Sequence, residues 1–175
     1  TAAVVEPDPR IRMTAADRVA QHEALAEILA LSKRMGLAIT AAANIRRQLD
    51  VLSQDLQKSG QAAPGLATSV QAFSEKFRAV EEEVVPKDLA STSMTREMAL
   101  RGGPINMQIL QLGMSISGYP AAPTRTELLQ IAQIKQKVEG LVDRVNGLIG
   151  EDIPALNTVL EENKLKPLKA PEKVK

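Results

Sequence analysis

The sequence predicts an all-α protein, an elongated up-down bundle of four main helices with short extra helices in the 87–103 loop and at the C-terminus. Between Ala24 and Leu56, apolar residues recur alternately four and three positions apart, and no proline falls between Pro9 and Pro64. No run alternates apolar and polar residues as a strand would. A helix of roughly 40 residues is about 60 Å long. Its stripe therefore needs antiparallel partners of similar length.

The first helix is predicted from about Ala15 to Lys58. Thr14 is a suitable N-cap, and Asp17 favours the positive end of the helix dipole. Gly60 can take the left-handed conformation that ends a helix. The predicted stripe consists of Ala24, Ile28, Leu31, Met35, Ala38, Ala42, Ile45, Leu49, Leu52 and Leu56.

Two further helices follow, separated by a segment without a clear pattern. The second helix follows the turn at Pro64 and ends at Pro86, and a short helix is predicted within 87–103. Pro104 is favourable at the first position of the third helix, which ends at Gly118. The stripes are Leu66, Val70, Phe73, Phe77, Val80 and Val84, then Ile105, Ile109, Leu112 and Ile116.

The fourth helix begins with a capping box formed by Thr124 and Glu127. Around Gly150 we expect the helix to kink or break, and Asp152 can cap a new start that runs to about Asn163. The apolar positions are Ile131, Ile134, Val138, Leu141, Val145 and Leu148, then Ile153, Leu156 and Leu160.

These elements divide the chain into three parts. Residues 1–13 read as an extended linker or the end of an upstream β domain, because Pro7 and Pro9 forbid a helix across them. Residues 14–165 form the bundle, and the proline-punctuated residues 166–175 are predicted to be a flexible tail. Because the chain starts at a threonine, we expect it to be a piece of a longer protein.

Composition limits the possible functions. Aromatic residues make up only 2% of the chain, so the core must be built from aliphatic side chains, which suits helix-on-helix packing. The net charge of +1 comes from interspersed charges and argues against nucleic-acid binding, and the lysines of the tail read as a solvated terminus. Without cysteine, thiolate chemistry is excluded. No run of 18 apolar residues is present, so no membrane insertion is predicted.

No residue pattern indicates catalysis, a cofactor or a metal. His22 is the only histidine, and neither the Glu-x-x-His of a di-iron bundle nor the second histidine of a zinc protease is present. Phosphate-binding glycine loops and a serine nucleophile elbow are also lacking. We interpret Met35, Met94, Met98, Met107 and Met114 as core residues. The prediction is that this chain is not an enzyme.

One end of the first helix carries more apolar residues than its stripe needs. Val19, Leu25 and Leu29 flank the heptad beside His22. A wider apolar face is what a second contact surface requires, so these four residues form a predicted docking surface for another domain. The alternative interpretation is that they cover the C-terminal helix 153–163.

Four segments resemble a known family. The segments are VVEPDPRI with TAADRVAQHEALAEILALSKRM, then ANIRRQLDVL, GGPINMQILQL and EDIPALNTVLEENKLKPL. They are similar to the C-terminal part of bacterial BNR-repeat or sortilin-like (VPS10-type) proteins known as glycosyl hydrolases. The matching positions are Asp8, Pro9 and Arg10, then Pro104, Ile105 and Asn106, then Asp152, Pro154, Ala155, Leu156 and Asn157.

The resemblance implies a setting for the chain. In that family a β-propeller and a β-sandwich precede the helical part, and any hydrolase activity belongs to the propeller. The chain would then be a non-catalytic accessory or interaction domain of a secreted or periplasmic protein, in contact with those domains or with another protein. Two alternatives stay open: that it contributes to the substrate site of a glycosyl hydrolase-like parent, and that it is a stand-alone helical adaptor.

Overall fold

The computed structural model describes residues 13–59, 64–84 and 104–175, and within them the predicted all-α class is confirmed. The predicted short helix in 87–103, the linker up to residue 12 and the stop at Gly60 lie outside the described residues. The helices are α1 (Ala15–Ser59), α2 (Pro64–Val84), α4 (Ile105–Ser117), α5 (Arg125–Gly147), the π-helical turn η2 (Leu148–Asp152) and α6 (Ile153–Glu162).

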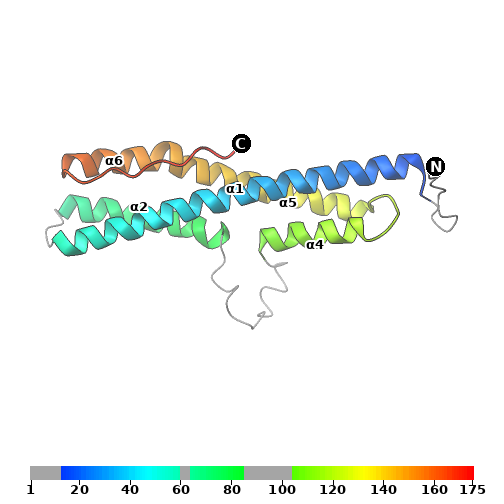
Figure 1. Ribbon diagram of the computed structural model, residues 1–175, viewed down its shortest axis with the longest axis horizontal. Helices are drawn as coiled ribbons and strands as arrows, with labels where there is room; N and C mark the ends of the chain where they lie inside the picture. Colours follow the sequence, from blue (N-terminus) through cyan, green and yellow to red (C-terminus); the bar gives the residue numbers. More distant parts are fainter. Residues whose placement is uncertain (1–12, 60–63, 85–103) are drawn as a thin grey trace, which may run out of the picture.

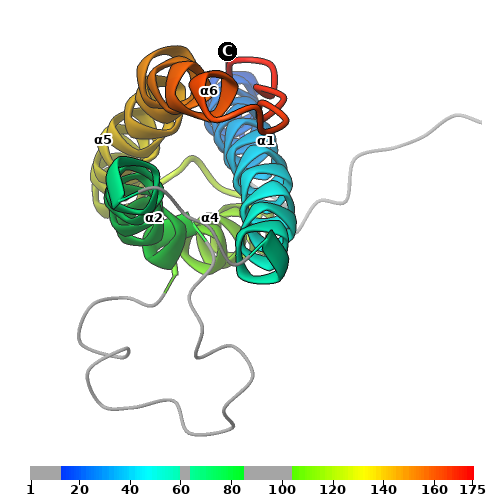
Figure 2. The same cartoon turned by 90° about the vertical axis from the view of Figure 1, so that its left-hand side faces the viewer.

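The bundle is elongated and up-down, as predicted (Figure 1). Helix α1 and the continuous rod α5–η2–α6 run the length of the molecule in the same direction, while α2 and α4 run the opposite way, one after the other. At one end α1, α4 and α5 pack together, and at the other α2 packs on α1, α5 and α6. The helices therefore surround one shared core, as the end-on view in Figure 2 shows.

The predicted stripes form that core. In α1, nine of the ten stripe residues are buried, and Leu56 is partly buried against them. All six stripe residues of α2 are buried, as are those of α5, η2 and α6. In α4, Ile105 lies partly buried at the edge of the core and the other three are buried. Burying a Leu, Ile or Val side chain contributes about 1.5–3 kcal/mol, so these stripes hold the fold together.

Ion pairs link neighbouring helices outside the core. Arg46 of α1 donates two hydrogen bonds to the carboxylate of Glu81 on α2, and its guanidinium lies 5.2 Å from the centre of the Phe77 ring. Arg144 of α5 likewise donates to both carboxylate oxygens of Glu83. Paired, in-plane hydrogen bonds of this kind fix orientation as well as distance. They connect α2 to both α1 and α5 at the surface of the bundle.

Two of the predicted N-caps, Thr14 and Thr124, are confirmed. The Thr14 hydroxyl accepts a hydrogen bond from the Asp17 backbone N–H at 3.1 Å, and the Thr14 N–H donates to the Asp17 carboxylate at 2.9 Å. Thr124 and Glu127 form the same reciprocal box at the start of α5. Two N–H groups at each helix start, which have no partner within the helix, are thereby satisfied.

The helix does not break at Gly150. Instead η2 widens the turn, and the backbone hydrogen bonding continues from α5 into α6. Asp152 makes no capping hydrogen bond, so its predicted role as an N-cap is wrong. Its carboxylate accepts a hydrogen bond from the Lys76 ammonium at 2.6 Å, which ties η2 to α2. A helix that continues through a single wide turn needs no new cap.

The end of α6 reverses the chain direction. Leu165 N–H donates to Leu160 C=O and Lys164 N–H donates to Glu161 C=O, both at 2.9 Å, and Lys164 has a φ of 58°. This is a Schellman C-cap with a lysine in the left-handed position that glycine usually fills. Leu165 packs against the core, as expected of the residue that follows that position.

Residues 166–175, the strap, then lie back along the bundle (Figure 1, red), which differs from the flexible tail that the sequence predicted. Leu168 and Val174 are buried. Three side-chain amides each bond both the N–H and the C=O of one strap residue, as a neighbouring β-strand would. The pairs are Asn157 with Leu168 (2.7 and 2.9 Å), Gln48 with Lys169 (2.6 and 2.9 Å) and Asn146 with Val174 (2.8 and 2.9 Å).

Candidate docking surface

The four residues predicted as a docking surface do not share one environment. Val19, His22 and Leu29 are exposed, with Leu29 at 70%, whereas Leu25 is partly buried and packs against the core. The alternative, that they cover the C-terminal helix, is wrong, because α6 lies at the opposite end of α1 (Figure 1). The neighbours of this end of α1 are α4 and α5.

Helix α4 carries an exposed apolar face that the sequence analysis did not identify. Leu110 and Met114 are 55% and 65% exposed, and Met107 lies on the same face. The prediction that Met107 and Met114 are core residues is wrong, whereas Met35 is buried as predicted. Met94 and Met98 lie outside the described residues. The available signal was that α4 contains no charged residue. A surface helix normally has a polar outer face.

The register between α1 and α4 is fixed by two contacts. The Gln21 side-chain amide donates to the Ile116 C=O at 2.7 Å. At Gly113, the position of a Cβ would lie 3.4 Å from Ile28, so glycine lets the two helices approach closely. Because the helices are antiparallel with a rise of 1.5 Å per residue, Leu29 lies within one helical turn of Leu110 along the axis.

The same contacts show which flanks face each other. Leu25 and Leu29 follow Gln21 by four and eight residues and are therefore turned about 40° and 80° from it around α1, so Leu29 lies beside the contact with α4 and faces outward. On α4, Leu110 is two residues past Gln108, which bonds Lys137 of α5, and so points away from α5. We call Leu29, Met107, Leu110 and Met114 the apolar patch. Exposed apolar side chains gathered on adjacent helices are typical of a contact surface.

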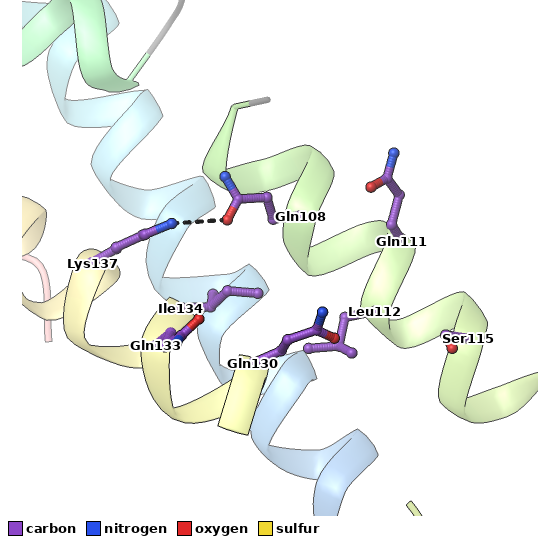
Figure 3. Close-up of a pocket in the computed structure, with 8 residues that line it drawn as sticks. All are labelled: Gln108, Gln111, Leu112, Ser115, Gln130, Gln133, Ile134 and Lys137. Carbon is purple, nitrogen blue, oxygen red and sulfur yellow. Dashed lines mark hydrogen bonds between the residues drawn. The ribbon is translucent and has the colours of Figure 1, made fainter. Parts of the chain in front are cut away.

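A polar groove lies on the other flank of α4, facing α5 (Figure 3). Its volume is about 430 Å³. Lys137 donates to Gln108 at 3.1 Å across it. The residues that line it are Gln108, Gln111, Leu112, Ser115, Gln130, Gln133, Ile134 and Lys137. Four amide side chains can donate and accept hydrogen bonds, but none of the lining residues is a carboxylate that could act as a base.

Ser115, at the edge of this groove, is not arranged as a nucleophile. Its hydroxyl donates to the Glu127 carboxylate at 2.7 Å, and Glu127 also accepts from the N–H and hydroxyl of Thr124. The hydrogen bond from Ser115, followed by those from Thr124, holds the pKa of Glu127 below its usual value. The carboxylate is thus part of a helix cap that joins α5 to α4.

Within residues 13–59, 64–84 and 104–175, no group of three or more His, Asp or Glu side chains could hold a metal ion. By length and composition alone, α1 over Ala15–Gln57 is apolar enough to cross a membrane. In the structure its buried stripe packs on α2, α4 and α5, as in the core helix of a bundle. In comparisons with protein-family models, curated proteins and solved structures, nothing matches this chain.

Proposed function

We propose that this chain is a non-catalytic helical-bundle interaction domain that docks on another polypeptide through the apolar patch. The observation that carries the proposal is the exposed apolar face of α4, beside Leu29 of α1, in a helix without any charged residue. An exposed leucine or methionine contributes little to the fold but gains free energy when a partner covers it.

The partner proposed first follows from the resemblance described above. If the chain belongs beside a β-propeller and a β-sandwich, then the N-terminal end of α1 is the end nearest to them. Leu29 lies in the first third of α1, and α4 lies in that half of the bundle (Figure 1). The proposal therefore places the bundle against an upstream domain of a secreted or periplasmic protein, with its role being to space or support that domain.

The test measures binding between the isolated chain and the domains encoded upstream of Thr1, supplied as a separate protein. The double variant Leu29→Glu/Leu110→Glu should weaken the affinity about tenfold or more, because charge replaces apolar contact at the centre of the interface. Val51→Glu is the control for a glutamate at another exposed apolar position: Val51 is 54% exposed on the C-terminal half of α1, far from the patch. It should bind like the wild type.

Two results would contradict the proposal. One is unchanged binding by the double variant. If that variant also has the same urea midpoint as Val51→Glu, and is therefore equally well folded, the apolar patch is not the interface. A gene without a β-propeller or β-sandwich before Thr1 would remove the family setting and favour the stand-alone adaptor.

A second candidate function is supported by the polar groove between α4 and α5. Its glutamines offer the mixed donors and acceptors that sugar hydroxyls need, which would fit a chain that contributes to a carbohydrate site. Calorimetric titration with a panel of oligosaccharides tests this function. Binding that is lost in Gln130→Ala/Gln133→Ala would support it, and no heat of binding with any sugar would exclude it.

A further inference from the structure

Basic residues gather where the strap lies on α1. Two adjoining hollows of about 560 and 640 Å³ open along this seam, and they share Asn44, Pro171 and Glu172. Among the described residues, seven basic ones line them, whereas Glu172 is the single acidic one that does so. The whole chain carries 22 basic and 21 acidic residues, so the seam concentrates positive charge on a nearly neutral protein. The basic residues are Lys33, Arg34, Arg47, Lys166, Lys169, Lys173 and Lys175.

Most of this charge has no ion-pair partner among the described residues. Of the seven basic residues, only Arg34 has such a partner, Glu139 at 3.9 Å, and the Arg34 Nε–H is buried without a hydrogen-bond acceptor. The other six make no ion pair with any described residue. Closely spaced like charges repel one another, and an anionic ligand removes that repulsion.

The seam also offers an apolar floor and a free amide. Leu37 is 44% exposed and lies between Ala30 and Ala41 in the floor of the first hollow. Asn44 lies where the two hollows meet, and no described residue hydrogen-bonds its side-chain amide. Three amides of this kind already hold the backbone of the strap on the same side of the molecule.

We infer that this seam is a docking groove for an extended acidic polypeptide segment that also carries apolar side chains. Carboxylates would pair with the basic rim, an apolar side chain would cover Leu37, and Asn44 would bond one residue's backbone as its counterparts bond the strap. A polypeptide fits better than a nucleic acid, because no aromatic side chain lines the seam for bases to stack on. The inference is independent of the apolar patch on α1 and α4.

The experiment screens the folded chain against an array of random peptides of about 12 residues, a length that spans about 40 Å when extended. Bound peptides should be enriched both in Asp and Glu and in Leu, Ile or Val. The tightest peptide is then titrated by fluorescence anisotropy at low and high salt, and its affinity should fall as salt screens the charges.

Variants locate the binding. Lys33→Gln/Arg47→Gln/Lys169→Gln should weaken it about tenfold or more, and Asn44→Ala should weaken it several-fold without changing the salt dependence. The matched control removes three basic side chains that do not line the seam, in Arg18→Gln/Arg78→Gln/Arg125→Gln. That control should bind within about twofold of the wild type.

Three results would overturn the inference. One is a set of bound peptides that is not enriched in Asp and Glu. Another is a control variant that loses as much affinity as the seam variant, which would indicate a general charge effect. The third is tighter binding of a single-stranded oligodeoxynucleotide or of anionic phospholipid vesicles than of the best peptide, which would assign the seam to phosphate groups. Circular dichroism of each variant verifies that the bundle is folded.

Discussion

Each of the three side-chain amides that bond the backbone of the strap forms a clamp. The clamp formed by Asn157 can be removed with a single substitution, Asn157→Ala. The side chain makes two hydrogen bonds to the backbone of Leu168, at 2.7 and 2.9 Å, and both are partly buried. Each hydrogen bond contributes about 0.5–1.5 kcal/mol, so the loss of both should lower the free energy of unfolding by about 1–3 kcal/mol. For a protein of this size, 2 kcal/mol corresponds to a Tm lower by about 4–8 °C.

The assay is urea and thermal unfolding followed by circular dichroism, with Thr158→Ala as the control. Both substitutions place alanine in the middle of α6, where Asn and Thr have similar helix propensities, so the propensity gain cancels between them. Thr158 bonds only to Pro154 of its own helix. The difference between the two variants therefore isolates the clamp.

A graded result is expected across the three clamps. Asn146→Ala should resemble Asn157→Ala, because its bonds to Val174 are also partly buried, whereas Gln48→Ala should have a smaller effect because its bonds to Lys169 are exposed. Equal stabilities of Asn157→Ala and Thr158→Ala would refute the reasoning. An unprotected Leu168 amide in native-state hydrogen exchange would refute it independently.

Further substitutions probe three other features. Leu49→Ala, in the buried stripe of α1, should cost about 2–5 kcal/mol in urea unfolding. Lys164→Gly should stabilise the protein by about 0.5–1 kcal/mol, because φ is 58° there, whereas Lys33→Gly inside α1 should destabilise it by about 1 kcal/mol. The hydrogen bond from Ser115 lowers the pKa of Glu127, so this stabilisation is present above the usual glutamate pKa and is lost as pH falls through the folded pKa. Wild type should therefore exceed Glu127→Gln in stability at neutral pH, and urea unfolding across a pH series should show the gap closing in acid.

The core could be predicted from sequence because it depends on local spacing. The alternation of four and three along α1 marks positions that share one helix face, and a face of that kind must be buried. The capping boxes at Thr14 and Thr124 could be predicted equally well, because the residues that form each box lie three positions apart in sequence.

The strap could not be predicted in the same way. Its backbone is held by amides at positions 48, 146 and 157, and the contact from Gln48 lies 121 residues away in sequence. Prolines within a segment indicate only that it is not helical, and neither they nor the lysines reveal a distant partner. The exposed face of α4 was missed for a related reason, since an apolar residue on a helix is by default assigned to the core.

The wide turn η2 also has a consequence for how this chain can change in length. Along α5, buried residues lie alternately three and four positions apart. From Val145 to Ile149 and from Ile149 to Ile153 the spacing is four positions both times, and in α6 it returns to three and four. The turn thus absorbs a phase shift of about one residue between two stripes. Removing Gly150 would leave an ordinary helical turn with both stripes still facing the core. Removing a residue within α5 instead would rotate everything after it by about 100° and expose one stripe or the other. This turn is therefore the place in the rod where a single-residue insertion or deletion is best tolerated.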